Sequence, residues 1–415
     1  MNINDILTFT IVLAAVFAYI NHKLIKWPPT IGIMVLSLVS SVILATLGRY
    51  FPLLSDKAKE LASSIDFHDI LMNFMLSFLL FAGAIHIDAC KLKKERWPVL
   101  ILSTLGILIS TVLVGAMVWY LLRLFQLPIP FIYCLLFGSL ISPTDPIAVL
   151  AILKAAHIPS SLETKISGES LFNDGVAVVL FITIFEVSRS GIADVSFFSV
   201  GKLFLQESVG GMLFGAMLGY AGFFALRSMD DYKVEVLTTI AVVMGGYWAA
   251  QHLHVSGPLA MVVAGIIMGN KVKDEAISDE SRDYLGKFWE LIDEILNAVL
   301  FLLIGLEMLI IKINPVIFLI GLVTIVIVLA ARFVSVLFPI LLMRFKIKFE
   351  QHAVLILTWG GLRGGLSVAL ALSLTTEMHR DEFVLITYMV VVFSILVQGL
   401  TIGKVAKKLL KPVTV

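Results

Sequence analysis

The sequence has few charged residues. Asp, Glu, Lys and Arg make up 15% of its 415 residues, whereas 59% are hydrophobic, and the mean hydropathy is +0.99. Ordinary soluble domains do not have this composition. The sequence therefore predicts an all-α polytopic membrane protein, because helices satisfy their backbone hydrogen bonds inside a bilayer.

Cysteine and net charge are also scarce. The two cysteines are Cys90, in a Lys-rich loop, and Cys134, in an apolar run. They predict neither a disulfide framework nor a metal cluster, and we expect no cofactor. A net charge of +1 gives no reason to expect a nucleic-acid partner.

Long apolar runs are abundant. Runs of about the length that a bilayer core demands predict about thirteen transmembrane helices. They fall at 6–25, 30–47, 67–87, 97–122, 129–153, 163–188, 204–226, 234–251, 256–270, 288–311, 315–342, 350–375 and 383–403. The first run has an acid, Asp5, before it and lysines at its C-terminal end. A signal peptide has its positive charges before the apolar run, so we interpret this run as a membrane helix.

Lys and Arg are distributed unevenly between alternate loops. The loops that follow the odd-numbered segments, together with the C-terminal stretch, hold three times as many as the others. The positive-inside rule therefore predicts an outside N-terminus, a cytoplasmic C-terminus and an odd number of helices. We expect a multi-pass protein of the cell inner (plasma) membrane, with residues 404–415 as a short basic cytoplasmic tail.

Two of the predicted helices are interrupted. Ser142-Pro143-Thr144-Asp145-Pro146 interrupts the fifth segment, and Gly360-Gly361-Leu362-Arg363-Gly364-Gly365 interrupts the twelfth. Interrupted helices in corresponding positions of two halves indicate a transporter site. Because seven segments separate them, we predict two inverted six-helix repeats, at about 6–188 and 234–403, joined by a linker helix at about 204–226, with the two broken helices crossing.

The first interruption offers oxygen ligands. Asp145 stands where it can cap a half-helix whose first residue is Pro146, and it can instead contact a transported ion. Thr144 offers a hydroxyl and a carbonyl for a hard cation, or is simply a turn residue. The sequence leaves both alternatives open for both residues.

The sixth segment carries Glu169-Ser170-Leu171-Phe172-Asn173-Asp174. At about 100° per residue, Ser170, Asn173 and Asp174 share one helix face, and Glu169 lies elsewhere. Acids at membrane depth are costly and mark ion or proton paths by default. We predict that Asp174 carries the ion, and that Asn173 is a ligand or a hydrogen-bonding brace.

Glu169 needs a buried partner, because an isolated buried charge is expensive. The candidates are Arg363 in the second interruption and Arg332 in the eleventh segment. We favour a structural salt bridge between Glu169 and Arg363. Arg332 either joins this network or extends to the membrane–water interface.

SPTDP, GESLFND and GGLRGG, in this order on these helices, resemble the electroneutral branch of the monovalent cation:proton antiporter superfamily. That branch includes the prokaryotic NhaP-type and the animal NHE-type sodium/proton exchangers. The resemblance spans nearly the whole chain. It implies a thirteen-helix homodimer with a dimerisation domain and a mobile six-helix core that works by an elevator motion.

The resemblance also implies site roles. Asp174 binds the cation or proton, and three residues complete the site: Thr144, Asp145 and Ser170. Glu169 and Arg363 form the salt bridge. Asn173 stands where electrogenic relatives have a second aspartate. The third segment departs from the family pattern, which puts His86 and Asp88 in doubt as site residues.

We therefore expect a secondary active antiporter and not an enzyme. It would exchange sodium for protons one for one, with both ions competing for Asp174, and sodium would contact Asp174, Ser170 and Thr144. The oxygen ligands do not distinguish sodium from lithium or potassium, so a potassium/proton antiporter is an alternative. A cation channel and a membrane-embedded hydrolase are weaker alternatives, because the inverted halves argue against a ring-shaped filter and the eight histidines are scattered.

Overall fold

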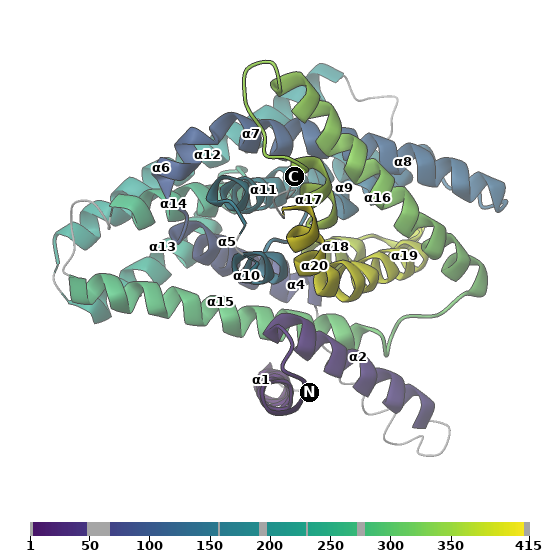
Figure 1. The fold of residues 1–415 in the computed structure, drawn as a ribbon, viewed down its shortest axis with the longest axis horizontal. Coiled ribbons are helices and arrows are strands. Elements are labelled where there is room, and N and C mark those ends of the chain that lie inside the picture. Colours follow the sequence, from purple (N-terminus) through teal and green to yellow (C-terminus); the bar gives the residue numbers. More distant parts are fainter. Residues whose placement is uncertain are drawn as a thin grey trace, which may run out of the picture.

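The computed structural model describes residues 3–47, 67–156, 158–190, 197–229, 231–271 and 279–410. Within these ranges the chain is almost entirely helical, with short π-helical turns (η1, η2, η3 and η7) inside several spans, and it contains no β-strand (Figure 1). This confirms the predicted all-α fold.

The first half contains α1 (Ile3–Ile20), η1 (Asn21–Ile25), α2 (Pro29–Leu47), α4 (Phe67–Ile70), η2 (Leu71–Met75), α5 (Leu76–Ile85), α6 (Ala89–Lys94), α7 (Arg96–Ile101), η3 (Leu102–Gly106), α8 (Ile107–Leu124), α9 (Phe131–Ile141), α10 (Ile147–Ala155) and α11 (Ser160–Ser190). The second half contains α12 (Phe197–Arg227), α13 (Tyr232–His252), α14 (Gly257–Lys271), α15 (Asp279–Glu307), α16 (Pro315–Met343), α17 (Ala353–Trp359), α18 (Gly365–Leu372), η6 (Thr376–Met378), α19 (Arg380–Phe393), η7 (Ser394–Gly399) and α20 (Leu400–Leu409).

Each of the thirteen predicted segments coincides with one helical run or with a pair of half-helices in these ranges. Eight runs are continuous, long and apolar enough to cross a membrane. Of the others, α14 has 15 residues, and α13 and α15 are long but more polar. The remaining two are broken, as α9 and α10 and as α17 and α18. The structure thus has the predicted multi-span architecture.

The helices form two bundles. The scaffold bundle contains α1, α2, α4, α5 and α12 to α15, and the core bundle contains α7 to α11 and α16 to α20. Helices pack mainly within their own bundle. In Figure 1 α12, α13 and α14 lie on the left, and α8, α16 and α19 lie on the right. The core bundle therefore takes segments four to six from the first half and eleven to thirteen from the second.

Small residues allow close packing inside each bundle. A Cβ at Gly138 of α9 would overlap the Thr111 carbonyl oxygen of α8, and a Cβ at Gly265 of α14 would lie 2.9 Å from the Phe81 carbonyl oxygen of α5. Transmembrane helices commonly use glycine in this way, because apolar surface alone does not drive them together in lipid.

The two broken helices meet at their interruptions. The backbone N–H of Asp145 donates to the carbonyl oxygen of Leu362 across 2.8 Å, in an isolated antiparallel bridge. The backbone N–H of Arg363 donates to Ser394 Oγ at 2.9 Å. Freed backbone groups at membrane depth need partners inside the protein, and these bonds supply them. The predicted crossing is confirmed.

Candidate functional site

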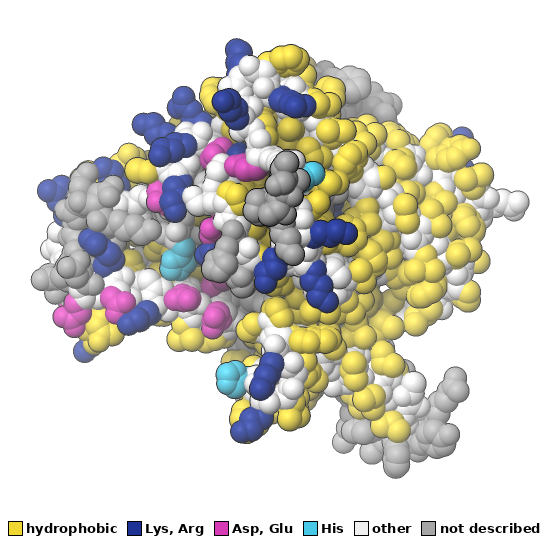
Figure 2. Space-filling model, viewed as in Figure 1, with side chains coloured by type: hydrophobic (Ala, Val, Ile, Leu, Met, Phe, Trp, Pro, Cys, Tyr) yellow, Lys and Arg dark blue, Asp and Glu magenta, His cyan; other side chains and the backbone are white. Residues whose placement is uncertain are grey.

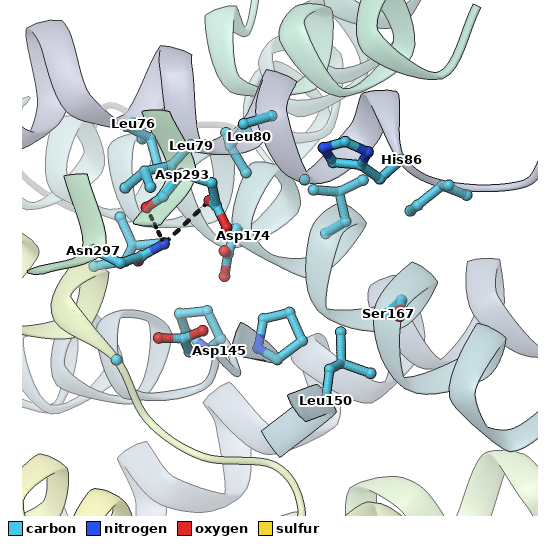
Figure 3. Close-up of a pocket in the computed structure, with 18 of the residues that line it drawn as sticks. Leu76, Leu79, Leu80, His86, Asp145, Leu150, Ser167, Asp174, Asp293 and Asn297 are labelled. Carbon is cyan, nitrogen blue, oxygen red and sulfur yellow. Dashed lines mark hydrogen bonds between the residues drawn. The ribbon is translucent and has the colours of Figure 1, made fainter. Parts of the chain in front are cut away.

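A cavity of about 550 Å³ lies between the two bundles (Figure 3). The core bundle contributes Asp145, Asp174 and the start of α18, and the scaffold bundle contributes α5 and one face of α15. Asp174 and Asp145 are both half-buried. The two predicted acids of the core bundle therefore share one cavity.

Asp174 has no partner among the residues that the structure describes. Its carboxylate makes neither a hydrogen bond nor an ion pair with any residue in the described ranges, and it lines the cavity. A half-buried carboxylate without a basic or hydrogen-bonding partner is costly. It is chemically suited to take up a cation or a proton.

Ser170 and Asn173 point toward the first interruption and away from the cavity. Asn173 Nδ2 donates to Thr144 Oγ1 at 2.8 Å, the Thr144 backbone N–H donates to Asn173 Oδ1 at 3.3 Å, and the hydroxyls of Thr144 and Ser170 are 3.1 Å apart. All three side chains are buried, and none is among the residues that line the cavity.

These bonds hold the unwound segment against α11. Asn173 acts here as a brace, one of the two roles that the sequence left open. Direct contact of Thr144 and Ser170 with the ion stays a prediction.

Glu169 pairs with Arg332 of α16, and the preferred sequence prediction of a direct Glu169–Arg363 pair is wrong. Arg332 Nη1 lies 2.5 Å from Glu169 Oε1, and both side chains are buried. In the core bundle α16 packs beside α17, and in this position its Arg332 side chain reaches Glu169 of α11. Arg332 therefore satisfies the buried carboxylate.

Arg363 has a different partner set. Its Nη1 donates to the carbonyl oxygens of Ser142 and of Pro143, the latter at 2.9 Å. These carbonyls directly follow α9, at the end of a helix that carries partial negative charge. Arg363 thus binds the first interruption from the second and reinforces the crossing.

Two residues of α15 in this cavity were not predicted. Asp293 and Asn297 line it together with Asp145 and Asp174, and Figure 3 labels all four. Asn297 Nδ2 donates to the Asp293 carbonyl oxygen at 2.7 Å and to Asp293 Oδ1 at 3.1 Å. With Glu290 they stand at intervals of three and four residues, which is a helix-face pattern that could have revealed them.

Charged residues at and near the ends of α5, α6, α10 and α11 also line the cavity. Lys154 Nζ lies 3.3 Å from Glu163 Oε1, and His86, Asp88 and Lys91 are among the lining residues. Asp88 Oδ1 accepts the backbone N–H groups of Cys90 at 2.9 Å and of Lys91 at 3.1 Å, so it caps α6. Within the described residues, neither His86 nor Asp88 forms a hydrogen bond with Asp174.

Comparisons with known proteins agree with this architecture. The family model described as "Sodium/hydrogen exchanger, transmembrane" matches residues 11–408. The Na(+)/H(+) antiporter NhaP of Pseudomonas aeruginosa is 47% identical over 98% of this chain and 96% of its own. The Na(+)/H(+) antiporter NhaH of Halobacillus dabanensis is 34% identical over 93% of both chains.

A solved structure has the same fold. The sodium proton antiporter MjNhaP1 from Methanocaldococcus jannaschii superposes with a TM-score of 0.76 over 98% of each chain, at 20% identity. Together with the family match over nearly the full length, this shows that the chain belongs to the transmembrane sodium/hydrogen exchanger family.

Proposed function

We propose that the protein exchanges sodium for protons across the membrane, with both ions competing for Asp174. The observation that carries the proposal is the Asp174 carboxylate, which lines the cavity without a partner among the described residues. One carboxylate holds one monovalent ion at a time, so occupancy by sodium excludes a proton. The two relatives named above are sodium/proton antiporters, which supports these two ions.

The charges of the core bundle support one-for-one exchange. Around the two interruptions its charged residues are Asp145, Glu169, Asp174, Arg332 and Arg363, whereas its other charges, such as Lys165 and Glu186 of α11, lie further along the helices. The formal charges around the interruptions leave one negative charge, which either a sodium ion or a proton neutralises. Both loaded forms then cross the membrane field without net charge, which makes the exchange electroneutral.

Alternating access follows from the two-bundle arrangement. Because the cavity lies between the bundles, a displacement of the core bundle along the scaffold bundle exposes Asp174 to either side in turn. This is the elevator motion that the sequence resemblance implies. The scaffold bundle would then also provide the interface of a homodimer.

Lys91 and Lys154 line the cavity, and both belong to loops that the positive-inside rule assigns to the cytoplasm. We therefore infer that the cavity faces the cytoplasmic side. In Figure 2 Lys and Arg side chains gather on the face that carries the C-terminus. This supports an inner-membrane protein with an outside N-terminus and a cytoplasmic C-terminus.

The test is exchange by the purified protein in liposomes that contain a pH dye. A sodium gradient should drive proton movement in the wild type, and Asp174→Asn should abolish it. Transport by Asp174→Asn equal to that of the wild type would refute the assignment. Glu294→Gln is the matched control, because this exposed residue of α15 does not line the cavity.

Two additions to this assay test the finer claims. An imposed membrane potential should leave the rate unchanged, and a strong response would require a second titrating group. Replacing sodium by lithium or potassium at the same gradient identifies the cation, and preference for potassium would establish the alternative antiporter.

A further inference from the structure

One wall of the cavity belongs to the scaffold bundle. On this wall α15 presents Glu290, Asp293 and Asn297 at successive turns, all lining the cavity. Glu290 is exposed, Asp293 is half-buried and Asn297 is buried. The row of oxygen-bearing side chains therefore leads from solvent into the depth of the cavity, toward Asp174.

Asn297 has an oxygen that no group in the described part of the chain satisfies. Its Nδ2 donates to the carbonyl and to the carboxylate of Asp293, which fixes the orientation of the amide. Its Oδ1 is buried and accepts no hydrogen bond from the described residues, and the side chain is 1% exposed. A buried acceptor without a partner is costly, so this oxygen indicates a ligand.

The neighbouring charge selects the ligand. Asp293 receives one hydrogen bond from Asn297, and no Lys, Arg or His of the described ranges forms an ion pair with it. A carboxylate and an amide oxygen on neighbouring turns of one helix are hard oxygen ligands, which suit a hard metal cation with part of its water shell. An anion would be repelled by Asp293 and by the acids across the cavity.

We propose that Asp293 and Asn297 form a second cation site on the scaffold wall, which binds sodium on its way between the cytoplasm and Asp174. This inference rests on the proposed exchange of sodium for protons. Because α15 packs with α2 and α5 in the scaffold bundle, the site stays behind when the core bundle moves. It raises the affinity for the entering ion and leaves the charge carried per cycle unchanged.

The first test measures sodium-dependent proton efflux from everted membrane vesicles, whose outer medium faces the original cytoplasmic side. Asp293→Asn should raise the KM for sodium about fivefold, the effect of losing one partly solvated charge pair, with the maximal rate retained. Asn297→Ala should raise the KM in the same direction. Glu294→Gln removes the neighbouring charge outside the cavity and should match the wild type.

The outcomes separate the two proposals. Wild-type vesicles that show no sodium-dependent proton movement would refute the exchange function. Active wild-type vesicles with an unchanged KM in Asp293→Asn would refute the second site alone. Loss of the maximal rate in a folded Asp293→Asn variant would also refute it, since that result would place Asp293 in the transport step itself.

A second test does not depend on transport. In purified Asp174→Asn protein the main site lacks its charge, and sodium in place of choline should still raise the thermal unfolding temperature. Adding Asp293→Asn should remove this stabilisation. The absence of any sodium effect in Asp174→Asn, or an equal effect in the two proteins, would overturn the inference.

Discussion

Replacing Arg332 by Met leaves the Glu169 carboxylate, which is 1% exposed, without the guanidinium 2.5 Å away. Removing one partner of a buried ion pair typically costs about 3–5 kcal/mol, because the other charge stays buried and uncompensated. We expect a loss of this size for Arg332→Met and for Glu169→Gln. Arg363 does not replace the lost partner, because the carbonyl oxygens of Ser142 and Pro143 hold its guanidinium.

The double variant should be more stable than the sum of the single losses predicts. With both charges removed, no uncompensated ion stays buried, and we expect a coupling of about 2 kcal/mol, within the range of contacting residues. Unfolding by dodecyl sulfate in mixed micelles gives the four free energies of the cycle. Additivity within about 0.5 kcal/mol, or a larger coupling between Glu169→Gln and Arg363→Met, would refute the Glu169–Arg332 pair.

Two further predictions concern packing and pH. Gly138→Val should destabilise the fold by about 3 kcal/mol in the same unfolding assay, because the new side chain would overlap the Thr111 carbonyl oxygen. The control is Gly245→Ala, whose added methyl group meets nothing within 4 Å and should not lower the stability. Equal effects of the two substitutions would contradict the packing argument. Burial alone would raise the pKa of Glu350, in the loop before α17, but hydrogen bonds from Ser161 and Lys165 and the charge of Lys165 lower it below its usual value. A carboxyl group whose pKa is lower in the folded state stabilises the fold at pH values above its unfolded-state pKa of about 4.3. This stabilisation is lost as the pH falls through the folded-state pKa. The stability difference between wild type and Glu350→Gln should therefore be largest near pH 7 and shrink in acid, and a difference independent of pH would contradict it.

The sequence predicted the spans and the interruptions well, because both depend on local signals. Hydropathy located the thirteen segments, and Pro143, Pro146 and the glycines of GGLRGG located the two breaks. The meeting of Asp145 with Leu362 followed from a physical requirement, since freed backbone groups at membrane depth need partners in the protein.

The partners of buried side chains were harder to predict. Arg332 and Arg363 both lie in segments that are otherwise uncharged at membrane depth, and the sequence contains no signal that says which one reaches Glu169. The choice depends on how α16 packs beside α11 and α17. Asp293 was overlooked for another reason, because the many charges of α15 obscured the helix face that it shares with Asn297.

The bridge between Asp145 and Leu362 is made of main-chain atoms, and Arg363 adds a clamp from one interruption to the other. These bonds join the two pairs of half-helices, so we expect the four half-helices to move together as one rigid body. In the proposed exchange cycle, water on the two sides of the bilayer would then reach Asp174 in turn as the scaffold bundle and the joined half-helices slide past each other.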